Sequence, residues 1–445
     1  MLRIWTDSRH AGFLDRHGNR GGTFAYEPEL ATARAVSVTM PVRLASWNSS
    51  DGLLPIFDMN LPEGVLRARL SASFANSFRS SPSGSFDDID LLAVVGGAQI
   101  GRIGCSPAET EIADDVPFQS IDEIIKAERG GELYEHLLRT FARHSGISGV
   151  QPKVLIRGLQ DQPPSVSERQ PHGVRPATHI VKLWDSNELP ELAANEYFCL
   201  CAARKAGLVV PGFQLSENGH ALVIERFDLK ADGSYRGFED FCVLNGLTSA
   251  KKYDGGYETR LFKRASDFIE VEGRRTSLER LFRLFVLNCA LRNGDAHLKN
   301  FGIIYDDVVG PARLAPVYDL VTTDAYIPDD PMALTLNGST MWPDKRALVV
   351  LAQSRCDIAT KEIGQILEQT ADALCDVMAD VKRYFSEVAA HSEIGDRMLN
   401  AWETGIAMSL ERSDDRMLLL SGAPAGKKPA RKQRRRPKAA SKRSI

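Results

Sequence analysis

Four polar residues that could carry out chemistry stand within six positions of the segment NGDAHLKNFG: Asp295, His297, Lys299 and Asn300. They follow SLERLFRLFVLNCALRNG, whose apolar spacing is typical of an amphipathic helix. An aspartate can accept the proton of a hydroxyl group, and an asparagine five residues later can bind a magnesium ion that bridges phosphates. The spacing favours Asp295 as a general base and Asn300 as a metal ligand, although each residue taken alone also suits an ordinary polar loop.

A second acid follows in RLAPVYDLVTT, where Asp319 comes directly after Tyr318 at the end of an apolar run. Two acids and an asparagine provide the oxygen ligands that magnesium prefers. Phosphoryl transfer depends mainly on positioning and on neutralising charge, and His297 or Lys299 could reach the transferring group. A zinc site at Asp295 and His297 is a weaker alternative, because the cysteines lack C-x-x-C spacing and the sequence has no H-E-x-x-H.

Two upstream lysines could neutralise nucleotide phosphates. In RHSGISGVQPKVLI, small residues form a turn directly before Lys153, and such a turn lets backbone N–H groups approach phosphate oxygens. Lys182 lies among apolar residues in THIVKLW, and Glu196 in the next helix could pair with it, as a strand lysine pairs with a helix glutamate in protein kinases. Taken alone, the first segment also suits a hairpin turn and the second an exposed edge-strand lysine. The order of all these segments favours the kinase-like interpretation.

The elements that must position these residues change in type along the chain. Residues 1–105 contain short apolar runs between Gly, Ser and Asn, which indicates a β-rich subdomain. Residues 106–225 contain a helical segment and the strands KVLIRGL, THIVKLW and HALVIERFDL, and helical patterns dominate residues 226–421. Strands first and helices later favour an α+β fold with two lobes over a doubly wound sheet. Residues 422–445 hold ten Lys and Arg and no acid, which predicts a disordered basic tail.

The composition is that of a soluble globular protein of 445 residues, with 43% hydrophobic and 25% charged residues. The net charge of -3 hides the basic tail, because the rest of the chain has 45 cations against 58 acids. Seven scattered cysteines suggest reduced thiols in a cytosolic protein. The first residues lack the apolar core of a signal peptide, and there is no apolar run of membrane-spanning length, so we expect no secretion and no membrane association.

Several segments together resemble the HipA-like serine/threonine kinases of bacterial toxin–antitoxin systems. They are SGVQPK (148–153), HIVK (179–182), ANEYFCLCAARKAGLVVP (194–211), VIERFD (223–228), NGDAHLKNFG (293–302) and LAPVYDL (314–320). In addition, PIFDMNLPEGVLR (55–67) is similar to a stretch of that family's N-terminal subdomain. The resemblance runs from residue 1 to about residue 420. It implies a two-lobed, protein-kinase-like fold with an N-terminal β-rich subdomain and a mostly helical C-terminal lobe.

The resemblance also implies an ATP- and magnesium-dependent enzyme. Asp295 would be the catalytic base, and Asn300 and Asp319 the magnesium ligands. Two loops, a strand lysine and a hinge beside adenine would contact ATP: Ser148, Gly149, Val150, Gln151, Pro152, Lys153, Lys182, Glu225, Arg226, Phe227, His297, Leu298, Lys299, Asn300, Tyr318 and Asp319. For the hinge segment there is an alternative interpretation, in which Phe227 is a core residue and Glu225 and Arg226 are a solvated pair.

Family members commonly carry an autophosphorylated serine seven residues before the loop lysine, but this sequence has Gly146 there. Ser148 is therefore the first candidate for autophosphorylation and Ser145 the second. A phosphate dianion at this loop would repel the phosphates of ATP or displace the loop.

The best-known targets of the family are aminoacyl-tRNA synthetases, whose phosphorylation arrests translation and growth, and the usual partner is a small DNA-binding HipB-like antitoxin. One alternative is a DNA-associated co-repressor or pseudokinase bound to that antitoxin, with the basic tail contacting DNA. A second alternative is a small-molecule kinase. The intact set of Lys182, Asp295, Asn300 and Asp319 favours an active enzyme, and the LPEG segment favours a HipA-like protein kinase. Its expected location is the bacterial cytosol, near the nucleoid when it is in complex.

Overall fold

The computed structural model describes residues 1–7, 9–18, 21–74, 86–112, 115–128, 130–159, 176–184 and 189–411. The predicted basic tail, 422–445, lies outside the described residues. All seven cysteines lie within the described residues, and none of them is in a disulfide. No helix in the described ranges is long and apolar enough to cross a membrane.

The N-terminal sheet has the strand order β4-β3-β2-β1-β5, and all its pairs are antiparallel. Strand LRIWT alternates between buried and half-buried side chains, so Leu2 and Ile4 point into the core. The strands are β1 (Leu2–Thr6), β2 (Arg9–His17), β3 (Gly21–Tyr26), β4 (Trp47–Ser49) and β5 (Ile103–Pro107). The helical elements between β3 and β5 are η1 (Thr32–Arg34), α1 (Pro55–Asp58), α2 (Gly64–Phe74) and α3 (Asp88–Val95).

The second sheet has the order β6-β7-β8-β10-β9, and only β6 runs parallel to its neighbour among the described pairs. Its register places Lys153 on β7 directly opposite Lys182 on β8. Like charges opposite each other destabilise a sheet, so this pair calls for nearby anions. The strands are β6 (Phe118–Ser120), β7 (Lys153–Leu159), β8 (His179–Leu183), β9 (Phe213–Leu215) and β10 (Ala221–Glu225). The accompanying helices are α4 (Ile121–Ile125), α5 (Gly130–Phe141), η2 (Ala142–His144) and α6 (Leu192–Lys205).

The remainder of the described chain is mostly helical. Its sheet has the order β11-β12-β13, with β11 (Gly237–Asp240), β12 (Gly302–Tyr305) and β13 (Arg313–Leu314). Its α-helices are α7 (Phe241–Leu244), α8 (Arg264–Phe268), α9 (Val271–Leu291), α10 (Lys345–Cys356), α11 (Thr360–Glu387) and α12 (Ile394–Gly405). Short 3-10 turns are η3 (Ser249–Lys251), η5 (Leu298–Asn300) and η6 (Thr323–Ala325), and π-helical segments are η4 (Tyr257–Lys263) and η7 (Ile406–Leu410).

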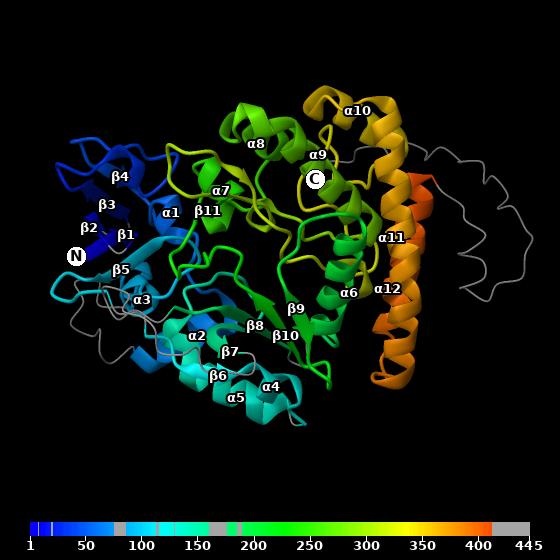
Figure 1. Ribbon diagram of the computed structural model, residues 1–445, viewed down its shortest axis with the longest axis horizontal. Helices are drawn as coiled ribbons and strands as arrows, with labels where there is room; N and C mark the ends of the chain where they lie inside the picture. Colours follow the sequence, from blue (N-terminus) through cyan, green and yellow to red (C-terminus); the bar gives the residue numbers. More distant parts are fainter. Residues whose placement is uncertain are drawn as a thin grey trace, which may run out of the picture. The chain divides into compact units, whose positions relative to one another are not determined.

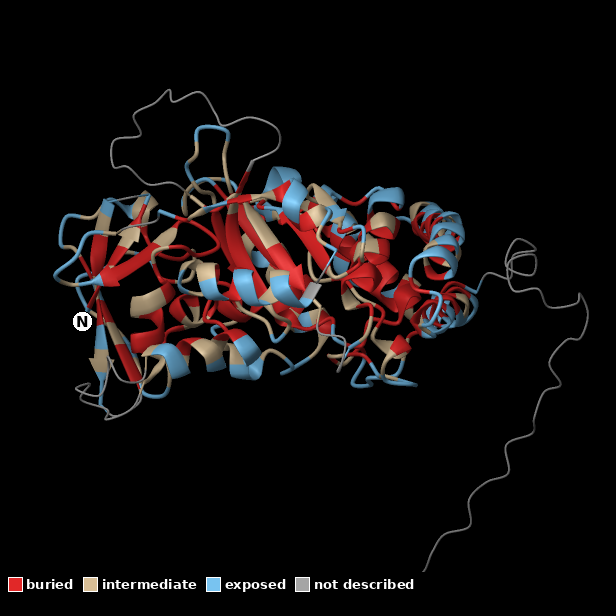
Figure 2. Cartoon of the chain, turned by 90° about the horizontal axis from the view of Figure 1, so that it is seen from below, coloured by how far each residue is buried: buried red, intermediate tan, exposed pale blue. Residues whose placement is uncertain are grey.

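Helix α9 is the central helix of this part. Its second half, Leu281–Leu291, is almost entirely buried, because α11 and α12 pack against it. Helix α11 also packs against α6, which joins the second sheet to the helical part (Figure 1). Buried residues lie along the strands and on the inward faces of the helices, whereas exposed residues lie on the outward faces (Figure 2). The predicted α+β fold, with a β-rich N-terminal subdomain and a mostly helical C-terminal lobe, is confirmed.

Candidate active site

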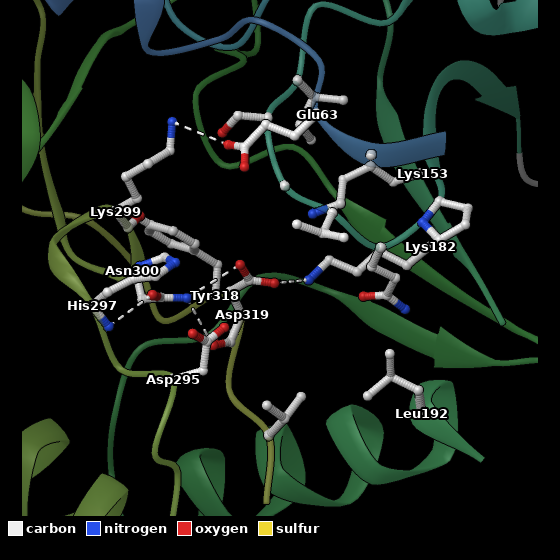
Figure 3. A pocket seen from close by; sticks show the side chains of 18 of the residues that line it. Glu63, Lys153, Lys182, Leu192, Asp295, His297, Lys299, Asn300, Tyr318 and Asp319 are labelled. Carbon is white, nitrogen blue, oxygen red and sulfur yellow. Dashed lines mark hydrogen bonds and ion pairs between the residues drawn. The ribbon is translucent and has the colours of Figure 1, made fainter. Parts of the chain in front are cut away.

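A cavity of about 960 Å³ brings together segments from all three parts of the described chain. Its wall contains the loop before β7, the two strand lysines and the polar segment after α9 (Figure 3). The predicted site residues that line it are Ser148, Gly149, Val150, Gln151, Pro152, Lys153, Lys182, Phe227, Asp295, His297, Lys299, Asn300, Tyr318 and Asp319. The fold therefore gathers most of the predicted residues around one space large enough for a nucleotide.

Lys182 forms two ion pairs at the floor of this cavity. Its Nζ lies 2.6 Å from Oε1 of Glu196, whose side chain is fully buried, and 2.5 Å from Oδ1 of Asp319, whose side chain is 35% exposed. Burial by itself lowers the pKa of Lys182, but Asp319 and Glu196 outweigh it, and the pKa lies above its usual range. Lys182 therefore stays charged in the folded protein and holds helix α6 to the Asp319 segment.

The two carboxylates respond differently to this lysine. Burial raises the pKa of Glu196, and the attraction of Lys182 only partly offsets it. Burial also acts to raise the pKa of Asp319, but the charges of Lys182 and Lys153 outweigh it and lower the pKa well below its usual range. Asp319 is thus held as a carboxylate, the form that a cation requires.

Lys153 is a buried cation with no ion-pair partner within the described residues. Its side chain is almost fully buried, and burial is the main reason that its pKa is lowered. Its Nζ lies under the loop before β7: a Cβ on Gly149, where φ is +115°, would lie 2.2 Å from that atom. A buried charge without a direct ion-pair partner is costly. An anion entering the cavity, such as a phosphate, would therefore be stabilised by Lys153 and Lys182 together.

The segment after α9 places Asp295 and Asn300 beside Asp319. Helix α9 ends at Arg292, which adopts the left-handed conformation and turns the chain into the cavity. The Asn300 side-chain amide donates to Oδ2 of Asp319 at 3.2 Å. Asp319 itself adopts φ of +56°, the left-handed conformation that aspartate tolerates better than most residues other than glycine. Burial raises the pKa of Asp295, and the repulsion of Asp319 adds to it, whereas a hydrogen bond from Tyr253 opposes it.

His297 and Lys299 both line the cavity, but their surroundings differ. Burial is the main reason that the pKa of His297 is lowered, to about 3, so its ring is neutral near pH 7. Lys299 Nζ points away from the strand lysines and donates to the backbone oxygen of Met59 at 2.8 Å and to Ser249 Oγ at 2.7 Å. Because a buried ammonium group needs acceptors, Lys299 joins the segment after α9 to the N-terminal part of the chain.

The predicted hinge contributes one side chain to the cavity wall. Phe227 stacks on Tyr318 at 5.8 Å between ring centres, and the two rings offer an apolar surface to a base. The Glu225 and Arg226 side chains do not line the cavity. Arg226 is buried and donates to both carboxylate oxygens of Asp228, at 3.0 and 2.6 Å, so the alternative of a solvated pair is wrong. Leu298, predicted among the ATP contacts, is instead fully buried outside the cavity wall.

The donor set fits magnesium better than zinc. In the described part of the chain there is no cluster of three or more His, Cys, Asp or Glu that could hold a metal ion, which leaves the zinc alternative without support. Magnesium needs fewer protein ligands, because it keeps several waters and binds phosphate oxygens directly. The Asp319 carboxylate would be one protein ligand here, and the Asn300 amide oxygen, which accepts the His297 N–H at 3.1 Å in this structure, would be the second once the amide turns over.

Comparison with known protein families identifies both halves of this chain. The HipA N-terminal domain matches residues 2–106, and the HipA-like C-terminal domain matches residues 145–378, more than half of the chain. This chain belongs to the HipA-like family. The cavity described above lies largely within the HipA-like C-terminal domain, with further wall residues from the HipA N-terminal domain.

Relatives agree with this assignment. Two Sinorhizobium fredii proteins are similar to this chain. "Putative kinase Y4mE" is 28% identical to it, over 89% of this chain and 96% of its own length. "Putative kinase Y4dM" is 29% identical, over 61% of this chain and 63% of its own length. Among solved structures, HipA of Shewanella oneidensis, in a toxin–antitoxin complex with HipB and operator DNA, covers 92% of this chain and 98% of its own with a TM-score of 0.59 and 17% identity. The HipA-like chain therefore has the HipA fold.

The two candidate serines of the HipA-like domain have different surroundings. Ser145 is fully buried: its hydroxyl donates to the Phe141 backbone oxygen at 2.7 Å and accepts the Leu155 N–H at 2.9 Å. It cannot receive a phosphate without the loop opening. Ser148 is half-buried and lines the cavity.

Among the cavity-wall residues that sequence reasoning missed are Glu63, Gly64 and Tyr253. Glu63, within the LPEG segment, accepts from Lys252 Nζ at 3.2 Å. The next residue, Gly64, lies against the phosphate-side loop, since a Cβ there would be 2.7 Å from the Val150 backbone oxygen. Tyr253 donates its hydroxyl to Oδ1 of Asp295 at 2.6 Å. LPEG was quoted only as a family feature, and Tyr253, beside the glycine pair of KKYDGGYE, carried no chemical signal of its own.

Proposed function

We propose that this HipA-like chain is an ATP- and magnesium-dependent serine/threonine protein kinase. The observation that carries the proposal is the buried, unpaired Lys153 opposite Lys182, in the same cavity as Asp319, Asn300 and Asp295. Two cations, two oxygen ligands for magnesium and one further carboxylate are the parts that phosphoryl transfer requires. The names of the similar Sinorhizobium proteins agree with kinase activity.

In this proposal each residue has a separate task. Lys153 and Lys182 neutralise the phosphates of the nucleotide, and Phe227 and Tyr318 pack against its base. Asn300 and Asp319 hold magnesium, which neutralises the charge of the phosphates when it is bound. Asp295 accepts the proton of the acceptor hydroxyl, and its raised pKa makes its carboxylate a better base than an exposed aspartate.

The cellular role that we propose is that of a HipA-like toxin in the bacterial cytosol. A HipB-like DNA-binding antitoxin would be its partner, and an aminoacyl-tRNA synthetase its protein substrate, so that phosphorylation inhibits translation and growth. Support for the antitoxin comes from the Shewanella HipA structure, which contains HipB and operator DNA. Phosphorylation of Ser148 would inactivate the enzyme, because a dianion at the cavity wall repels ATP phosphates.

The proposal is tested with purified wild-type protein and Asp295→Asn, incubated with radiolabelled ATP and magnesium and with a lysate depleted of small molecules. We expect labelled proteins only with the wild type, while both proteins bind ATP and unfold at similar temperatures. Phosphoproteomics of cells expressing the two forms would then identify the acceptor. Near-normal labelling by Asp295→Asn would remove Asp295 from the role of base, and an absence of transfer by the wild type would refute the kinase proposal.

A further inference from the structure

Tyr253 already places a hydroxyl group on the proposed catalytic base. Its Oη donates to Oδ1 of Asp295 at 2.6 Å, within the range required between a general base and the proton it removes. Within the described residues, no other side-chain hydroxyl hydrogen bonds to that carboxylate. Both residues line the cavity that holds Lys153, Lys182 and Asp319. The phenol therefore occupies the place where an acceptor hydroxyl must lie.

The surrounding backbone holds Tyr253 in that place. The Leu298 N–H of the catalytic segment donates to the Lys252 backbone oxygen at 3.1 Å, so the residue before Tyr253 is tied to the residues after Asp295. The Tyr253 ring also packs edge-on against His297, with 5.1 Å between ring centres. On the other side the ring is open, since Tyr253 is 49% exposed and Gly255 and Gly256 follow it. The Tyr253 ring is thus held beside Asp295 but can still rotate away from it.

We infer that Tyr253 is an intramolecular phosphate acceptor of this chain, an inference that rests on the proposed kinase function. In the transfer, the bond between the γ-phosphorus and the β,γ-bridging oxygen of the nucleoside triphosphate breaks. A bond forms between that phosphorus and Tyr253 Oη, the phenol proton passes to Asp295, and the nucleoside diphosphate leaves with the electron pair.

The charges around Tyr253 favour movement of its ring away from Asp295 once the ring is phosphorylated. Asp295, Glu63 and Asp330 all act electrostatically on Tyr253, so a phosphate dianion on its ring would be repelled by three carboxylates. Lys252, whose Nζ lies 5.6 Å from the ring centre and is paired with Glu63 at 3.2 Å, offers one cation against these three carboxylates. The phosphorylated ring should therefore turn away from Asp295 toward solvent and Lys252. Until then, the unmodified phenol competes with any external acceptor for the base.

The experiment compares wild type, Tyr253→Phe, Asp295→Asn and the control Tyr197→Phe, which removes a phenol on α6 outside the cavity. Each protein is incubated with ATP and magnesium, and its phosphorylated peptides are mapped by mass spectrometry. We expect phosphate on Tyr253 in wild type and Tyr197→Phe and on neither of the other two. Because Tyr253→Phe frees the base, its transfer to a general acceptor such as casein should rise about fivefold, the worth of one hydrogen bond.

A measurement without nucleotide tests the contact itself. With 3-fluorotyrosine at position 253, the fluorine resonance of nucleotide-free protein should shift on Asp295→Asn, and an unchanged resonance would overturn the inference. Phosphate on Ser148 or casein with Tyr253 unmodified would also overturn it and leave the proposed function standing. If wild type transfers phosphate to no acceptor, water included, both the inference and the proposed function fail.

Discussion

Replacing Lys182 with methionine should destabilise the protein through the charges that it leaves behind. Lys182 is 5% exposed and pairs with Glu196, which is fully buried, and with Asp319, which is 35% exposed. Removing one partner of a buried ion pair costs about 3–5 kcal/mol. We expect about 3 kcal/mol, the lower end of that range, because water can still reach the Asp319 carboxylate. The ratio of folded to unfolded protein would then fall roughly 150-fold.

A double-mutant cycle separates this effect from lost packing. The free energy of unfolding is measured by urea titration for wild type, Lys182→Met, Glu196→Gln and the double variant. If the cost comes from the stranded Glu196 carboxylate, the double variant should recover about 2 kcal/mol relative to the sum of the single changes. Additive losses would show that the pair contributes no coupling and would refute the reasoning.

The same variant should respond to pH in a defined direction. In the wild type, the pKa of Asp319 is lowered, so its stabilisation is present above its unfolded pKa of about 4 and is lost as the pH falls. Without Lys182 this contribution shrinks, since of the two lysines only Lys153 still attracts Asp319, and the pKa of Glu196, already raised by burial, should rise further. Folded Lys182→Met then takes up a proton on acidification. The difference in free energy of unfolding between Lys182→Met and the wild type should therefore become smaller from about pH 7 toward about pH 5. A constant difference would contradict the role of the unpaired Glu196 carboxylate.

Three further predictions concern nucleotide and turnover. Asp319→Ala should weaken ATP binding in the presence of magnesium about tenfold or more and leave magnesium-free binding little changed, as measured by calorimetry; unchanged magnesium dependence would argue against the metal assignment. Gly149→Ala should raise the Kd for ATP about tenfold, because a side chain is strained at φ of +115° and the methyl group would displace the Lys153 Nζ, whereas Gly131→Ala, a site with open space, should have no effect. Glu63→Gln, which removes the charge that faces Lys252, should lower kcat about threefold with KM for ATP unchanged, and a change confined to KM would refute a role in positioning the catalytic segment.

The sequence determined the features that depend on local spacing. The apolar periodicity of α9, the strand pattern around Lys182 and the interval between Asp295 and Asn300 are all properties of neighbouring residues, and they indicated an α+β fold and a kinase-like chemistry. Asp319 was predicted from its position directly after Tyr318 at the end of an apolar run, and the family resemblance implied the same residue. Lys182, Asp295, Asn300 and Asp319 line one cavity, although Lys182 and Asp319 stand 137 positions apart in the chain.

Tertiary structure decided the contacts between segments distant in sequence. Only the register of β7 and β8 sets Lys153 opposite Lys182, and only packing against the N-terminal part turns Lys299 toward Met59, 240 positions away. Burial makes the Ser145 hydroxyl inaccessible to phosphorylation, although its sequence surroundings closely resemble those of Ser148. Periodicity reports which face of an element is buried, but it carries no information on the partner that buries it. For that reason the sequence predicted a base at Asp295, and the fold alone placed a hydroxyl on it.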